Sequence, residues 1–119
     1  MIVTNFVFKR GKTFTFNVTC TSGGVAFDLT GATLKFLAKY NITDLDASAV
    51  IALTTPTGIV VAAPTTGVAQ VQILTANTSG LTNVETVLHW ELQVTSATNS
   101  FTVASGLITV EPAAIVASP

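Results

Sequence analysis

Apolar and polar residues alternate with a period of two along much of this chain, and this pattern constrains its fold more than any other feature. Between residues 13 and 21 every second residue is apolar, and the residues between them are threonine or asparagine. Because successive side chains of a strand point to opposite faces, this segment is predicted to be a strand with one buried face and one threonine-rich face.

The same alternation returns in two later segments, residues 33–40 and 84–94. Tyr40 continues the apolar face of the first segment, and Val84 begins the apolar face of the second, so we expect both side chains to point inward. The residues predicted to form the hydrophobic core are Phe14, Phe16, Val18, Leu34, Phe36, Leu88, Trp90 and Leu92.

Turns rich in glycine, proline, serine and asparagine separate further short strands, expected at residues 25–29, 50–53, 59–62, 68–74 and 101–110. A short helical turn is expected within residues 75–81. Along residues 101–110 the apolar residues change from odd to even positions. This change of phase predicts a β-bulge at Ser105 and Gly106.

About seven to nine short strands, with a turn signal about every 8–12 residues, predict an all-β, immunoglobulin-like antiparallel β-sandwich. A closed barrel is the structural alternative. We expect one domain over residues 1–111, followed by an apolar tail at residues 112–119 that has no evident strand partner.

The scarcity of charge excludes several classes of function. Charged residues make up 9% of the chain, and the net charge is −1, whereas an ordinary globular domain has about 25% charged residues. Five lysines and arginines cannot supply the roughly 6–10 phosphate contacts of an electrostatic nucleic-acid binder, so no nucleic-acid partner is expected. No apolar run approaches the roughly 18 residues of a membrane span, so no membrane partner is expected.

Charged residues in two turns suggest sites that their context does not support. Asp44 and Asp46 match the start of a calcium-binding loop, but the position that requires glutamate is Thr55, so no metal is expected. Lys9, Arg10 and Lys12 form a small basic cluster, which we expect at a solvated hairpin tip.

The chain contains one cysteine and one histidine, Cys20 and His89. The alternation places Cys20 on a buried face and His89 on an outward face, so the two are not expected to form a nucleophile–base pair. Glu91 shares the outward face of His89, and we expect both side chains to be solvated. The sequence therefore predicts no catalytic residue and no cofactor, and we expect a protein that is not an enzyme.

Leu37 and Val87 are apolar residues on strand faces that are otherwise polar. In the tail, Ile115 and Val116 are also apolar and have no assigned partner. A weakly charged chain that exposes several apolar residues should have packing partners. We expect these four residues to contribute to subunit contacts in a homo-oligomer.

Four segments, in their order and spacing, resemble small phage and prophage proteins with immunoglobulin-like folds. They are residues 8–14 (FKRGKTF), 28–36 (DLTGATLKF), 87–94 (VLHWELQV) and 106–112 (GLITVEP). The arrangement is similar to the N-terminal domain of phage baseplate upper proteins and to related tail, fibre and head-decoration modules. Baseplate upper proteins continue into a long receptor-holding region that this chain lacks, which favours a compact cement, decoration or adaptor role.

The resemblance implies a non-enzymatic structural protein of a tailed-phage virion, made in the host cytoplasm and located in the particle. Its partners would be other virion proteins of the capsid, neck, tail or baseplate, on which it would form a homo-oligomer. The alternative is a surface binding module, for example one that recognises carbohydrate or attaches to a host. Trp90 and Tyr40 are the aromatic residues besides phenylalanine, and both are phased inward, which disfavours that alternative.

Overall fold

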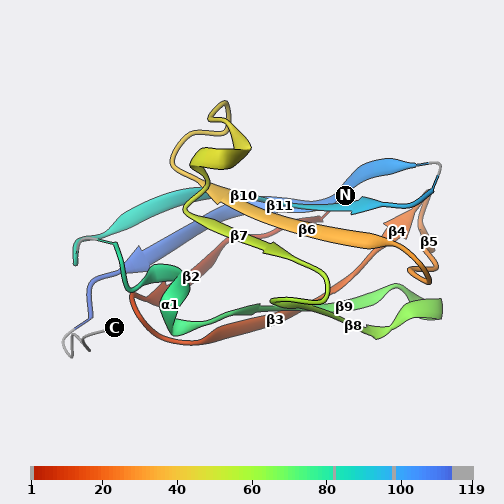
Figure 1. The fold of residues 1–119 in the computed structure, drawn as a ribbon, viewed down its shortest axis with the longest axis horizontal. Coiled ribbons are helices and arrows are strands. Elements are labelled where there is room, and N and C mark those ends of the chain that lie inside the picture. Colours follow the sequence, from red (N-terminus) through yellow and green to blue (C-terminus); the bar gives the residue numbers. More distant parts are fainter. Residues whose placement is uncertain (1, 82, 98, 114–119) are drawn as a thin grey trace.

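Two β-sheets pack face to face in the computed structural model, which describes residues 2–81, 83–97 and 99–113 (Figure 1). The strand order of the larger sheet is β1 (Ile2–Val3), β11 (Ser100–Glu111), β10 (Thr86–Thr95), β6 (Thr33–Lys39) and β7 (Ile51–Thr54), with β2 (Phe6–Lys9) also paired to β11. The strand order of the smaller sheet is β3 (Phe14–Thr19), β9 (Val68–Ile73) and β8 (Ile59–Ala63). A short hairpin pairs β4 (Thr21–Ser22) with β5 (Val25–Ala26).

The predicted all-β, immunoglobulin-like sandwich is confirmed, because the described strands form two main sheets that do not close into a barrel. Among the described residues, eight strands have four or more residues, as expected, and β1, β4 and β5 add short pairs of two residues each. One feature differs from the expected all-antiparallel arrangement. Both β1 and β2 run parallel to β11, whereas the other pairings are antiparallel.

Within the described ranges, three short helical segments connect strands, namely η1 (Asp46–Ser48), η2 (Pro64–Thr66) and α1 (Thr75–Thr78). The last lies in the segment where a helical turn was expected. In the part of the chain that the structure describes, no helix combines the length and the apolar character needed to cross a membrane.

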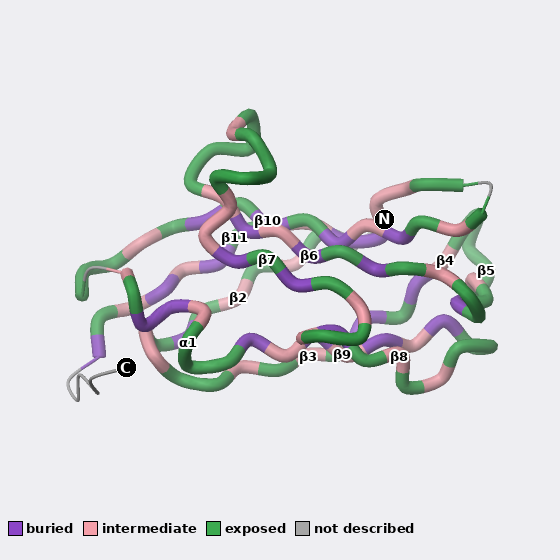
Figure 2. The backbone as a smooth tube through the Cα atoms, viewed as in Figure 1, coloured by how far each residue is buried: buried purple, intermediate pink, exposed green. Residues whose placement is uncertain are grey.

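The inward positions of both sheets meet in one core between them (Figure 2). Six of the predicted core residues are buried there: Val18, Leu34, Phe36, Leu88, Trp90 and Leu92. Phe14 and Phe16 point inward as predicted but are only half-buried, because β3 lies at the edge of its sheet. Their rings pack instead against the phenylalanines of β2, with 5.1 Å between the ring centroids of Phe8 and Phe14.

The prediction that Tyr40 and Val84 point inward is wrong, since both side chains are exposed. Each residue lies just beyond the end of a strand: β6 ends at Lys39, and β10 begins at Thr86. Alternation buries a side chain only where the backbone is still paired in a sheet. The chain has already entered a turn at these two positions.

The predicted β-bulge is present in β11, but it lies a few residues earlier than expected. On β10, Leu92 pairs with Ala104, and the residue after it, Gln93, pairs with Thr102. Val103 is therefore the extra residue of the bulge, and both Val103 and Ala104 are buried. The bulge produces the change from odd to even inward positions that the sequence shows.

Gly106 allows the N-terminal segment to approach Trp90. The indole Nε1–H donates a hydrogen bond to the Thr4 carbonyl oxygen at 3.1 Å. A Cβ atom at position 106 would lie 1.8 Å from that oxygen and 3.0 Å from the indole nitrogen. Only glycine leaves room for this contact, which holds the segment between β1 and β2 against β10 and β11.

The tail after β11 begins with a fixed contact. Ala113 is buried, and its backbone N–H donates to Asn83 Oδ1 at 2.8 Å, while Asn83 Nδ2 donates to the Ala113 carbonyl oxygen at 3.2 Å. The first residues of the tail therefore have a side-chain partner, although the sequence suggested none. Ile115 and Val116 lie outside the described residues.

We predict that Gly106→Ala lowers the free energy of unfolding by about 2–4 kcal/mol, because the added methyl group must displace the Thr4 carbonyl group. Gly80→Ala is a matched control, since a Cβ atom there meets nothing within 4 Å. Urea denaturation of both variants measures the effect. An equal loss of stability in the two variants would contradict the role of Gly106.

Candidate functional site

The outer face of the larger sheet brings together side chains from five strands. Cross-strand pairs place His89 beside Lys39, Glu91 beside Leu37, and Gln93 beside Lys35. The odd-numbered residues of β10 point outward here because its even-numbered apolar residues fill the core. The β6–β7 connection rises above this face, as Figure 1 shows.

A hollow of about 150 Å³ lies between this connection and the sheet. Its lining combines charged, amide, aromatic and aliphatic groups, namely Lys35, Leu37, Lys39, Ile42, Asp46, His89, Trp90, Glu91 and Gln93. Glu91 is held in place by Thr102, whose hydroxyl donates to Glu91 Oε1 at 2.7 Å. The hollow therefore offers fixed polar groups of both charges beside apolar surface.

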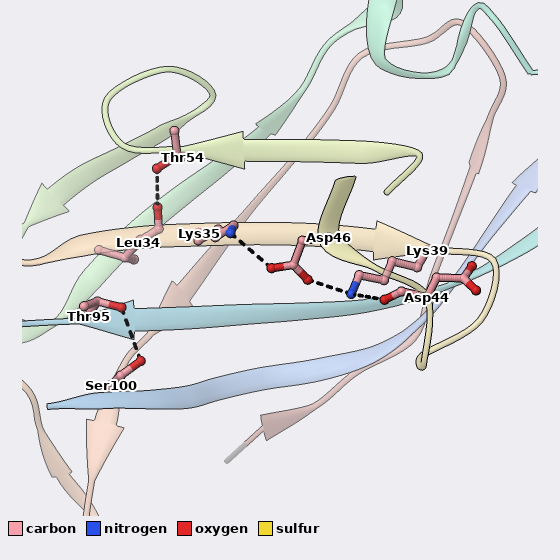
Figure 3. Close-up of polar contacts among 8 residues, drawn as sticks. All are labelled: Leu34, Lys35, Lys39, Asp44, Asp46, Thr54, Thr95 and Ser100. Atoms are coloured by element: carbon pink, nitrogen blue, oxygen red, sulfur yellow. Dashed lines mark hydrogen bonds and ion pairs between the residues drawn. The ribbon is translucent and has the colours of Figure 1, made fainter. Parts of the chain in front are cut away.

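Asp46 lies on the β6–β7 connection and pairs with two lysines of β6, so it joins the connection to the sheet below the hollow (Figure 3). Lys39 Nζ donates to Asp46 Oδ1 at 2.8 Å and to the Asp44 carbonyl oxygen at 2.8 Å, and Lys35 Nζ donates to Asp46 Oδ2 at 3.3 Å. The Lys39 side chain is 14% exposed and the Lys35 side chain 45%, so Lys39 is the more firmly held of the two lysines. The hydrogen bond from Lys39, followed by that from Lys35, lowers the pKa of Asp46.

The carboxylates of Asp44 and Asp46 therefore stabilise the β6–β7 connection. Asp44 Oδ2 accepts a hydrogen bond from the backbone N–H of Asn41 at 3.1 Å, and Asp46 is paired with two lysines. Among the described residues, no three His, Cys, Asp or Glu side chains gather in a way that could hold a metal ion.

An apolar patch adjoins the hollow on the same face. It consists of Val3, Val7, Leu107 and Val87, and all four side chains are exposed. Val7 and Val87 flank Thr109 from opposite sides of β11, and Val3 pairs with Ser105. Leu107 lies on β11 between Ser105 and Thr109, so the patch spans four neighbouring strands.

Exposed apolar side chains are concentrated on this side of the molecule. Among the described residues, eleven large hydrophobic side chains are exposed. The four of the patch lie on the outer face of the larger sheet, and three more, Tyr40, Ile42 and Leu45, lie on the connection above it. The remaining four are Val25, Val60, Leu74 and Val84. A concentration of exposed apolar side chains on one side of a molecule is typical of protein contact sites.

The sequence identified part of this face. Val87 is exposed in the patch, and Leu37 is half-buried in the floor of the hollow. Sequence reasoning missed Val3, Val7 and Leu107. Alternation with Phe6 and Phe8 could have placed Val7 outward, but its neighbours could be found only from the parallel pairing with β11.

Cys20 lies inside the sandwich and His89 lies on the outer face of the larger sheet, as predicted. Cys20 is fully buried, and His89 is exposed on the outer face. Burial raises the pKa of the Cys20 thiol to about 11. The thiol is therefore protonated at neutral pH and packs as a small apolar side chain.

The basic turn is not simply solvated, contrary to the prediction. Arg10 is half-buried, and its guanidinium donates to the carbonyl oxygens of Ser79 and Leu81, at 2.6 Å for Leu81. Lys9 forms an exposed ion pair with Glu111 at 3.5 Å. Arg10 therefore ties the β2–β3 turn to the end of α1.

Comparisons of the chain with protein-family models and with curated proteins found no match.

We predict that the carboxylate of Asp46 titrates below its ordinary pKa of 3.8. Lys39→Met should raise this pKa more than Lys35→Met, because the hydrogen bond from Lys39 is the larger cause. The pKa is lowered by folding, so the associated stability is present above about pH 4 and is lost as the pH falls through the folded-state pKa. Carboxyl-carbon NMR titration measures the shifts, and an unchanged pKa in Lys39→Met would refute the assignment.

We predict that Cys20 of the folded protein reacts with iodoacetamide at pH 8 at least about 100-fold more slowly than in urea, because its pKa is two units above the ordinary value of 9.0. The unfolded thiol ionises first as the pH rises, so stability should fall between about pH 9 and pH 11. Mass spectrometry of the alkylated protein provides the rates. Similar rates in the folded and unfolded chain would show that Cys20 is accessible.

Proposed function

We propose that this chain is a non-enzymatic structural protein of a tailed-phage virion, which docks as a decoration, cement, adaptor, tail or baseplate module on other virion proteins. It would be made in the host cytoplasm and function in the particle as a homo-oligomer. The resemblance of its four sequence segments to phage immunoglobulin-like proteins supports the virion setting.

The observation that carries the docking role is the apolar patch beside the charged hollow on one face of the sandwich. Val3, Val7, Leu107 and Val87 are exposed apolar side chains on neighbouring strands of one face, and such side chains cost little to desolvate. Lys35, Asp46 and Glu91 line the hollow on one side of the patch, and their charges can set the orientation of a partner. An apolar centre with a polar surround is the usual composition of a protein–protein interface.

The alternative, a carbohydrate-binding or host-attachment module, has less support. Sugar recognition commonly uses an exposed aromatic ring as a platform. Trp90 borders the hollow, but it is only 3% exposed, and its indole is hydrogen-bonded to Thr4. Tyr40 is exposed, but it is not among the residues that line the hollow.

We predict that Val7→Lys and Val87→Lys each weaken binding to the particle at least tenfold and lower the copy number accordingly where sites are unsaturated, since each places an unpaired charge in the contact, at a cost of about 1.4 kcal/mol or more. Quantitative mass spectrometry of purified particles from the host of this gene gives the copy number.

Val60→Lys serves as the matched control. Val60 lies on β8 of the smaller sheet and is 43% exposed, whereas Val87 is 45% exposed. Equal unfolding temperatures of the three variants would exclude misfolding as the cause of lost binding. Absence of the wild-type protein from particles would overturn the proposed function, and equal incorporation of all three variants would overturn the assignment of the patch.

A further inference from the structure

Strand β3 (Phe14–Thr19) has a free edge in the part of the chain that the structure describes. It pairs only with β9, at one end of the smaller sheet. An immunoglobulin-like sandwich could place its first strand at this edge, but here β1 and β2 both pair with β11 of the opposite sheet. The backbone groups along the outer side of β3 are therefore available.

The hydrogen bonds of the smaller sheet show which groups face the free edge. The N–H of Cys20 donates to Gly67 on the β9 side, and the N–H of Gln72, which pairs with Thr15, points away from β3 to Gly58. Antiparallel strands alternate the direction of their backbone groups. Those of Thr15, Asn17 and Thr19 consequently point to the free edge, and all three residues are exposed.

An apolar cleft of about 320 Å³ opens beside this edge. Its residues are Thr4, Phe6, Phe16, Asn17, Val18, Thr19, Trp90 and Ala104. The rings of Phe6 and Phe16 lie 4.4 Å apart between their centroids, and each lies 5.6 Å from the ring of Trp90. An apolar cavity of about 150 Å³ holds a benzene molecule, so this cleft has room for aliphatic side chains.

Three of the other edge strands, β8, β7 and β2, carry features that discourage strand addition. A register shift interrupts β8, and prolines stand near its two ends, at Pro56 and Pro64. The turn that follows β7 folds back on that strand, so that the Thr54 N–H at its end donates to the Thr57 carbonyl oxygen. Strand β2 is short and ends in Lys9. Strand β3 has no charge, proline or bulge, which are the usual protections of an edge.

We propose that the free edge of β3 binds an extended, uncharged segment of a partner protein, with aliphatic side chains at alternate positions. Its backbone pairs with Thr15, Asn17 and Thr19, and its aliphatic side chains enter the cleft between Phe16 and Thr4. Its other side chains are small and polar, like the threonines beside them. The inference rests on the proposed docking function and adds the chemical character of the segment that is bound.

The test uses the blocked peptide Thr-Ile-Thr-Val-Thr-Ile-Thr and the full chain labelled with ¹⁵N. At a peptide concentration about ten times its dissociation constant, amide exchange of Thr15, Asn17 and Thr19 should slow about tenfold, since about one edge in eleven is then free. The amides of Phe16 and Val18, which face β9, provide the internal reference. A peptide with lysines at the aliphatic positions should give no protection.

Asn17→Pro should abolish the protection, because it removes a donor that faces the partner and not β9. Thr15→Lys combined with Thr19→Lys is a second variant that keeps every backbone donor, and Gln70→Lys on the central strand is its matched control. Protection that is lost in the edge variants and kept in Gln70→Lys would support the proposal. Absence of protection in the wild type, or equal protection in all variants, would overturn it.

The two proposals fail separately in this design. Val7→Lys and Val87→Lys lie on the outer face of the other sheet and should leave peptide binding unchanged. Undiminished particle incorporation of Val7→Lys and Val87→Lys, with intact peptide binding, would contradict only the docking role of the patch. Intact incorporation without peptide binding would contradict only the role of the β3 edge.

Discussion

The indole of Trp90 fixes how the first strands join the sandwich. Its Nε1–H reaches the Thr4 carbonyl oxygen across Gly106, at the point between β1 and β2 where the chain passes along β11. The ring also contacts Phe6, so both N-terminal strands are held on the larger sheet. They cannot at the same time pair with β3, and this is why β3 keeps a free edge and the cleft between the sheets stays open on that side.

The two outer faces of the sandwich have different characters, although alternation produces both. On the smaller sheet the outward residues are mostly threonine, asparagine and glutamine, and Gln72 donates to Gln70 at 2.8 Å. On the larger sheet, the parallel strands β1 and β2 add valines beside Leu107, and the β6–β7 connection adds a hollow with charges fixed by Asp46. One face is therefore polar and uncharged, and the other combines exposed valines with paired charges.

The core could be predicted because the period of two persists wherever a strand is paired. Phe36, Leu88 and Leu92 are buried for this reason. Tyr40 and Val84 were wrongly placed inward because the apolar–polar alternation of the sequence continues beyond the residues that are paired in a strand. The change of phase predicted the bulge. Its exact position depends on how β11 pairs with β10, and the sequence of β11 alone does not specify that register.

The candidate site was predictable only in part. Val87 could be placed outward from its own strand, because the side-chain direction is a local property. Its neighbours Val3 and Val7 come from parallel pairs that are separated from it by most of the chain. Alternation specifies which face a residue takes and therefore determined the strands, their inner faces and the core. The order of the strands is set by long-range backbone pairing and packing, and so only the tertiary structure assembled the patch, the hollow and the open edge of β3.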